Sequence, residues 1–367
     1  MPEMDLSLGR AVVCVPARNE ADALPRLIRS LERQEGAGDG ARLRILVLAN
    51  NCTDATVATL RAMEQAGDIP GLHLRVVEAT IAPPDAHVGT ARRRALDAGA
   101  AWLAEGSVVD GVLLSTDADA IAPSDWVRAN LRALRHAELV GGRLRLQEET
   151  QAIDPTLRAL HDRIEEYWSA VRGLEEALDP PAHDPAPRHG DHVAASLSLR
   201  ADLYQAVGGL PMLACGEDNA LVSRVRRHGG RVRHCPHVSI AVSDRGIGRV
   251  QGGMATEMTR RARVAAGLES YRLPAAQHWR ALIERRRAVA AAFTDRAGPE
   301  AALAALGIAP ADIAAIAPAA CPNAIALLER LEGQIGEGIP EAVSVPLDEA
   351  LAGLHAMLAE TRMARVA

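Results

Sequence analysis

The sequence predicts an α/β protein whose mainly parallel β-sheet carries helices on both faces. Through residues 10–120, short β-rich apolar runs alternate with amphipathic segments at helical spacing. Strands that are joined by helices pair in parallel through right-handed crossovers, so both faces of the sheet are covered. Beyond residue 253 the chain is rich in alanine and interrupted by proline and glycine, which predicts a helical extension.

The individual elements follow from apolar runs and from the residues that break them. Pro16 ends the first run, and the segment Asn50 to Asp54 combines turn and helix-capping residues between a strand and a helix. Strands are expected at residues 10–15, 43–48, 72–77, 112–115, 139–146 and 193–199, and helices at 21–34, 55–66, 89–104, 157–178 and 217–228. We expect one α/β domain over residues 1–253, with halves at about 1–120 and 121–253, and the helical extension over 254–367.

Composition excludes several classes of function. The net charge is −6 and aromatic residues make up 2% of the chain, so neither a basic surface nor stacking platforms favour nucleic acid as a partner. All basic residues are arginine, which excludes Schiff-base chemistry and a lysine-containing phosphate loop. The five scattered cysteines predict reduced thiols. Without an apolar run of about 18 to 20 residues or a signal-peptide pattern, the chain is expected to be cytoplasmic.

Asp117 and Asp119 come directly after the apolar run at 112–115. Residues two apart in extended backbone point to the same side, so both carboxylates can face one point beyond the strand. Hard divalent cations prefer one or two protein carboxylates, with substrate phosphates completing the shell. Open α/β sheets also bind their ligands at the carboxyl ends of strands. The alternative is an ordinary solvated turn, in which such triplets are common.

Two other segments allow more than one interpretation. The Pro/His-rich loop at 179–189, with the histidines and aspartates that follow, is a candidate for acceptor contact or for plain solvation. Residues 254–293 hold eight arginines and three glutamates, which fits either a helix packed on the main domain or peripheral contact with a membrane.

Five motifs in this order resemble the family 2 glycosyltransferases of the GT-A fold, over roughly residues 10–250. They are VPARNEAD, NNCTDAT, STDADA, SLSLRADLYQAVGGL and GEDNALVSRVRRHGGRV. The stretch SDRGIGRVQGG at 243–253 is similar to a subgroup of bacterial members. The resemblance implies a GT-A catalytic domain over 1–253 and transfer of a sugar from a UDP or GDP sugar to a hydroxyl acceptor, which is a small molecule, a glycan or a lipid-linked group. It also implies Mn²⁺ or Mg²⁺ as cofactor.

The same resemblance implies roles for particular residues. Asp119 is expected to bind the metal, with His237 as a further ligand. Asp218, beside Glu217, is expected to be the general base of an inverting transfer. One of the three consecutive arginines Arg92, Arg93 and Arg94 is expected to face the diphosphate. Arg93 is the predicted one, while the sequence leaves the rotation of the helix open. The nucleotide is expected to contact the following residues: Pro16, Ala17, Arg18, Glu20, Asn50, Asp54, Arg93 and Asp117.

Each of these residues also has an interpretation without a ligand. Acids such as Glu20, Asp54 and Glu217 are favoured at helix starts for structural reasons alone. Two other functions remain as alternatives: a nucleotidyltransferase that forms sugar nucleotides, and a non-catalytic protein that binds nucleotide sugars. A dinucleotide-binding dehydrogenase is disfavoured, because VPARNE stands where its glycine-rich motif would follow the first strand.

Overall fold

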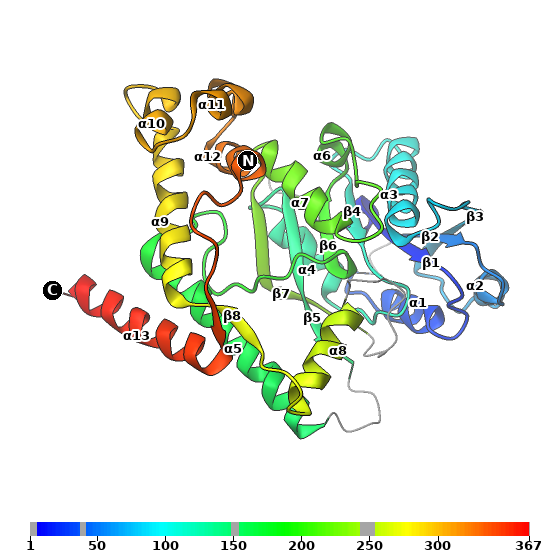
Figure 1. Ribbon diagram of the computed structural model, residues 1–367. Helices are drawn as coiled ribbons and strands as arrows, with labels where there is room; N and C mark the ends of the chain where they lie inside the picture. Colours follow the sequence, from blue (N-terminus) through cyan, green and yellow to red (C-terminus); the bar gives the residue numbers. More distant parts are fainter. Residues whose placement is uncertain (1–5, 37–41, 148–153, 243–253, 367) are drawn as a thin grey trace. The chain divides into compact units, whose positions relative to one another are not determined.

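The computed structural model describes residues 6–36, 42–147, 154–242 and 254–366 (Figure 1). Contacts divide the chain into two compact units. The first contains residues 1–149, 190–225 and 232–251, and the second contains 150–189, 226–231 and 252–367. The stretch at 243–253, with its bacterial-type motif, lies outside the described residues.

A seven-stranded sheet forms the centre of the first unit, in the order β3-β2-β1-β4-β6-β5-β7. Neighbours are parallel except where β6 runs antiparallel to β4 and to β5. The strands are β1 (Ala11–Ala17), β2 (Leu43–Asn50), β3 (Leu72–Ala79), β4 (Val112–Ser115), β5 (Leu139–Leu146), β6 (Leu197–Arg200) and β7 (Val232–Val242).

Helices cover both faces of this sheet, because alternate strand residues enter different cores. Val13 and Ile45 pack with α1 (Leu24–Glu32), α2 (Thr56–Gln65) and α4 (Trp126–Ala133). Val12 and Leu46 point the other way and pack with α3 (Val88–Glu105), α6 (Ala201–Ala206) and the buried residues of α7 (Glu217–Arg227). A parallel sheet is covered by helices on both faces, so its strands must be apolar on both sides.

The second unit is helical. One of its cores is built by α5 (Pro155–Leu178), α9 (Ala276–Ala292) and α13 (Leu347–Val366), with the short antiparallel pair β8 (Arg272–Pro274) and β9 (Ser344–Pro346). The basic helix α8 (Met254–Ala265) packs against α5. Another core joins α9 to α10 (Pro299–Ala305), α11 (Pro310–Ile316) and α12 (Ala324–Ile335).

The predicted fold class is confirmed: a mainly parallel sheet is flanked by helices, and further helices follow it in the chain. Contacts group residues 150–189 with the C-terminal helices, and α5 packs its apolar side on α13 and α9. The expected domain boundary at 253/254 stays a prediction. Within the described residues, no helix is both long and apolar enough to cross a bilayer.

Candidate active site

The loops after β1 and β2 interlock at the carboxyl edge of the sheet. Asn19 Oδ1 accepts from the Thr53 backbone amide at 2.8 Å, and the Asn19 side-chain amide donates to Thr53 Oγ1 at 3.3 Å. Thr56 Oγ1 accepts from the Glu20 amide at 2.8 Å. The expected nucleotide-contacting segments VPARNE and NNCTD are therefore held together by direct hydrogen bonds.

Asp54 ties the second of these loops to the first. Its carboxylate accepts from the Ala21 amide at 3.1 Å and from the Thr56 amide at 3.0 Å. The hydrogen bond from the Thr56 hydroxyl, together with these amides, lowers the pKa of Asp54. Asp54 is exposed and ionised, whereas Glu20 and Asn50 are buried and Arg18 is exposed. Its structural role as a cap and the expected role in binding a base use the same carboxylate.

Asp117 and Asp119 follow β4 and both are half-buried, while Ala118 between them is buried at 4% exposure. The Ala120 amide donates to the Asp117 carbonyl at 3.2 Å, so these residues form a turn rather than extended backbone. The Asp119 backbone carbonyl accepts from the Gln147 side chain at 2.8 Å, which fixes the turn. Both residues are partly accessible at the end of β4, and the expected orientation of their carboxylates toward one cation stays a prediction.

Arg92 of α3 lies beneath this edge and is 4% exposed. Its guanidinium donates to Asp117 Oδ1 at 2.7 Å and to Ser115 Oγ at 2.9 Å, and its Nε lies 3.4 Å from Glu217 Oε1. Burial lowers the pKa of Arg92, but the nearby carboxylates of Asp117, Glu217 and Asp218 outweigh it, so the pKa is raised overall. Arg92 is thus a permanent cation that joins the two acidic segments.

Glu217 and Asp218 begin α7 but have different surroundings. Glu217 is 6% exposed, and burial raises its pKa although the Arg92 guanidinium opposes the shift. Asp218 is half-buried, and its Oδ2 accepts from the Ala194 amide at 3.1 Å. The Ala194 carbonyl accepts from Arg92 at 3.3 Å, so the backbone of this one residue connects the buried cation to Asp218.

The segment that carries Ala194 lies against two glycines of β5. A Cβ on Gly141 would meet the Asp191 carbonyl oxygen at 2.3 Å, so this close approach requires glycine. On the same segment, His192 Nε2 lies 2.9 Å from Asn219 Oδ1 and its Nδ1 lies 3.0 Å from His234 Nε2. The segment therefore holds two successive residues of the first turn of α7.

Arg93 does not enter this network. It pairs with Asp97 at 2.6 Å, one turn further along α3, and donates to the carbonyls of Gly208 and Leu210 at 2.8 and 3.0 Å. The arginine that bonds to the acid pair is Arg92, because helix packing turns that residue inward. Of the three arginines, Arg92 is the one that bonds to Asp117, and the expected contact of Arg93 with the diphosphate stays a prediction.

His237 is exposed within β7, where the register against β5 shifts between Gly142 and Arg143. The residue of β7 that bridges to the segment after Asp119 is Ala241, which pairs with Ile121. Among the residues that the structure describes, no cluster of three or more His, Cys, Asp or Glu side chains is arranged to hold a metal ion. The expected role of His237 as a further metal ligand stays a prediction.

The loop at 211–216, directly before Glu217, packs tightly on the first turn of α3. A Cβ on Gly89 would lie 1.9 Å from the Leu213 carbonyl oxygen and 3.0 Å from two further backbone atoms of the same residue. Gly89 precedes Arg92 by about one helical turn, so this contact places the loop beside the buried cation.

Gly89→Ala is expected to lower the unfolding free energy by about 1–3 kcal/mol, because the loop backbone must move to admit the methyl group. Gly173→Ala in α5 is the matched control: its Cβ would meet only the Leu358 side chain at 3.6 Å. Replacing a helical glycine there should stabilise the protein by about 0.5–1 kcal/mol. Urea denaturation of both variants measures the difference, and equal stabilities would contradict the tight contact at Gly89.

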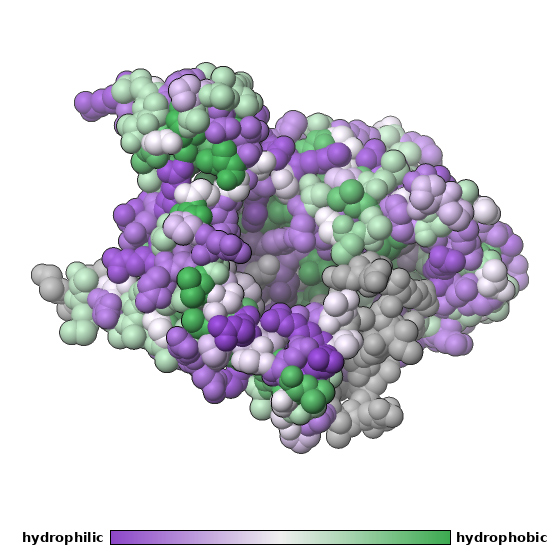
Figure 2. Space-filling model, viewed as in Figure 1, coloured by the Kyte–Doolittle hydropathy of each residue, from purple (hydrophilic) through white to green (hydrophobic). Residues whose placement is uncertain are grey.

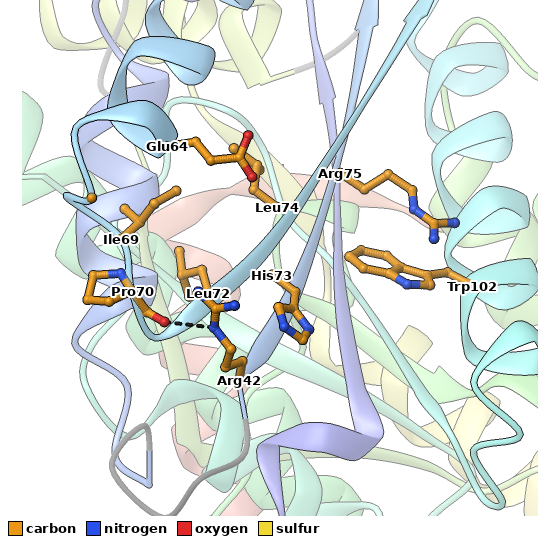
Figure 3. A pocket seen from close by; sticks show the side chains of 10 residues that line it. Arg42, Glu64, Ile69, Pro70, Leu72, His73, Leu74, Arg75 and Trp102 are labelled. Atoms are coloured by element: carbon orange, nitrogen blue, oxygen red, sulfur yellow. Dashed lines mark hydrogen bonds between the residues drawn. The ribbon is translucent and has the colours of Figure 1, made fainter.

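A hollow of about 490 Å³ lies elsewhere, at the amino end of β3 (Figure 3). Arg75 stacks on Trp102 with its guanidinium carbon 4.3 Å from the ring centroid, and Arg42 donates to the Pro70 carbonyl at 2.7 Å. Burial and two nearby arginines lower the pKa of His73, which keeps this imidazole neutral. Because β3 and β4 point the same way, the hollow is at the opposite edge of the sheet from Asp117 and is not part of the acid cluster.

The sequence contains a signal for the buried position of Arg92 that the motifs do not include. Arg92 precedes Ala95 and Leu96 by three and four residues, so it continues the apolar stripe that runs to Leu103. A charged residue within a buried stripe needs a partner, and this points to a buried ion pair. The role of the Ala194 peptide has no sequence signal, because any residue supplies the same backbone groups.

The chain belongs to a family of glycosyl-transferring enzymes: residues 9–287 match the model described as "Glycosyltransferase like family 2". The family is the one that the motifs imply, and the mainly parallel seven-stranded sheet is of the expected fold class. Comparison with curated proteins found none that matches this chain.

Several solved structures are similar to this chain at low identity. Mannosyltransferase PcManGT from Pyrobaculum calidifontis, solved with GDP-Man and Mn²⁺, is 18% identical with a TM-score of 0.44, over 96% of this chain and 86% of that one. S. aureus TarS 1–349 with UDP-GlcNAc is 13% identical, TM-score 0.44, over 71% and 66%. Glucosyl-3-phosphoglycerate synthase from Mycobacterium tuberculosis is 15% identical, TM-score 0.40, over 72% and 84%. The match to another S. aureus TarS structure covers 43% of that chain.

Proposed function

We propose that this protein transfers a sugar from a nucleotide-sugar donor, a UDP or GDP sugar, to a hydroxyl acceptor with inversion at the anomeric carbon. The observation that supports this most is the Arg92 network. It joins the carboxylates after β4 to the carboxylates at the start of α7, within a family of glycosyltransferases. Donor chemistry and acceptor chemistry need acids in two separate places, and this arrangement supplies them.

The donor nucleotide is proposed to lie against the interlocked loops after β1 and β2. Arg18 is exposed there, and the fixed carboxylate of Asp54 can accept a hydrogen bond from a base. Buried Glu20 and Asn50 support the same edge. The hydrogen bonds between Asn19 and Thr53 keep the two loops in a fixed relation, which reduces the entropy lost when a ligand binds.

A divalent cation, Mn²⁺ or Mg²⁺, is proposed to be held by Asp119 with Asp117 beside it. Both residues are half-buried at the end of β4, and hard oxygen donors of this kind fit such ions. When bound, the ion neutralises charge that develops on the departing diphosphate. Arg92 orients Asp117 by its 2.7 Å bond and adds a fixed positive charge under the same edge.

Asp218 is proposed to be the general base. Its carboxylate is half-buried and is oriented by the Ala194 amide, so an acceptor hydroxyl can reach it. The base takes the hydroxyl proton as that oxygen attacks the anomeric carbon on the face opposite the diphosphate. Glu217, which is buried against Arg92, is proposed to position this helix end rather than to accept the proton.

Asp119→Ala is expected to weaken metal-dependent donor binding at least about tenfold, since even outer-shell partners of metal ligands are worth about 10- to 100-fold. Isothermal titration of the donor with and without Mn²⁺ measures it. Asp68→Ala, an exposed acid in the turn before β3, is the matched control. Donor affinity that stays unchanged in Asp119→Ala would remove the metal assignment.

A thermal-shift panel of nucleotide sugars, with and without Mn²⁺, identifies the donor. Release of the nucleoside diphosphate and of the sugar then separates the proposed transferase from its alternatives. A binding protein would be stabilised without turnover. A nucleotidyltransferase would instead release pyrophosphate from a nucleoside triphosphate and a sugar phosphate.

A further inference from the structure

The loop before α7 exposes large apolar side chains next to the proposed base. Met212 is 60% exposed and Leu213 is 44% exposed, and they stand four to five residues before Glu217. The loop is packed against the main domain, because the backbone of Leu213 lies against Gly89, one turn of α3 from Arg92. These side chains are therefore presented in a fixed place beside the acid pair.

A further exposed apolar residue comes from the segment on β5. Val193 is 38% exposed and directly precedes Ala194, whose amide donates to Asp218 at 3.1 Å. Val193, Met212 and Leu213, here called the apolar rim, belong to the two segments that hold the carboxylates at the start of α7. On the face drawn in Figure 2, hydrophobic residues are interspersed with hydrophilic ones. Single exposed apolar residues of that kind are ordinary, whereas exposed apolar residues on both segments that adjoin the start of α7 favour a binding surface there.

From this arrangement we infer that the acceptor is an alcohol with an apolar portion next to its reactive hydroxyl, and that the apolar rim binds that portion. The inference rests on the proposed function, with Asp218 as base. Acceptors of purely polar chemistry would leave the rim in water, whereas an alkyl or similar group covers it and releases that water. The hydroxyl is then delivered to the Asp218 carboxylate.

The test uses a homologous series of alcohols as probes: methanol, 1-butanol and 1-hexanol, with the donor found in the panel. Alkyl glycoside formation by the full chain is followed by mass spectrometry. For the unmodified protein, kcat/KM is expected to rise by at least about twofold per added CH₂, roughly half the factor for full burial of that group. The double variant Met212→Ser/Leu213→Ser, and separately Val193→Ser, should flatten this dependence on chain length.

The chain-length dependence compares alcohols within one variant, so any effect on donor binding cancels. Val109→Ser is the matched control, because Val109 is 79% exposed but lies before the amino end of β4. It should keep the dependence of the unmodified protein. Donor turnover with a flat dependence, or a dependence that the rim variants leave unchanged, would overturn the apolar-acceptor inference alone. Failure to turn over any donor would instead overturn the proposed function on which it rests.

Discussion

Arg92→Met is expected to lower the unfolding free energy by about 3–5 kcal/mol, the range for removing one partner of a buried ion pair. The guanidinium is 4% exposed and bonds to two carboxylates, a hydroxyl and a backbone carbonyl. Methionine fills a similar apolar volume but leaves Glu217 buried without its cation. Urea denaturation measures the loss.

The loss should depend on pH in a direction fixed by Glu217. Burial already raises the pKa of Glu217, so its contribution to stability is complete below the ordinary carboxyl pKa and is lost as the pH rises through the folded-state pKa. Without Arg92 that folded-state pKa rises further. Arg92→Met should therefore be less destabilising at pH 5 than at pH 8.

Two variants make this prediction specific. Arg94→Met, in the exposed neighbour of the same helix, should change the unfolding free energy by less than about 0.5 kcal/mol. Adding Glu217→Gln to Arg92→Met should recover part of the loss, because the second change removes the stranded charge. Equal effects of Arg92→Met and Arg94→Met would refute the buried network.

Asp218→Asn is expected to reduce kcat for transfer by about 10²- to 10⁴-fold while leaving donor affinity close to that of the unmodified protein. The asparagine amide is nearly isosteric, and its oxygen can accept one of the two backbone hydrogen bonds, from Ala194 or from Asn219. The unfolding free energy should therefore fall by only about 1 kcal/mol. Donor titration and transfer kinetics on the same preparation separate the two effects.

The control for this change is another acid in the first turn of a helix. Asp202 begins α6, where it pairs with Arg200, and it takes no part in the Arg92 network. Asp202→Asn should therefore keep its transfer rate. Normal turnover by Asp218→Asn would eliminate this residue as the base and leave inversion without a proton acceptor among the proposed groups.

The sequence by itself determined the local elements and their order. Apolar runs such as residues 43–48 and 112–115 became strands β2 and β4, since a strand covered on both faces must be apolar throughout. The segment Asn50 to Asp54 lies where the chain passes from β2 to α2, as expected, whereas Pro16 did not end β1, which continues to Ala17 and pairs there with Ala49 of β2. Asp117 and Asp119 are half-buried around a buried Ala118, but the two-residue period of extended backbone stops before them, because the Ala120 amide donates to the Asp117 carbonyl in a turn.

Only the tertiary structure decided which residues meet. Local sequence patterns do not distinguish three consecutive arginines. Packing of α3 on the sheet turned Arg92 inward and left Arg94 in solvent. The bond from the Ala194 amide to Asp218 also depends on chain segments far apart in sequence and on glycine at 141. Periodicity fixes the conformation of a segment, whereas its rotation and its partners are set by long-range packing, which local sequence does not contain.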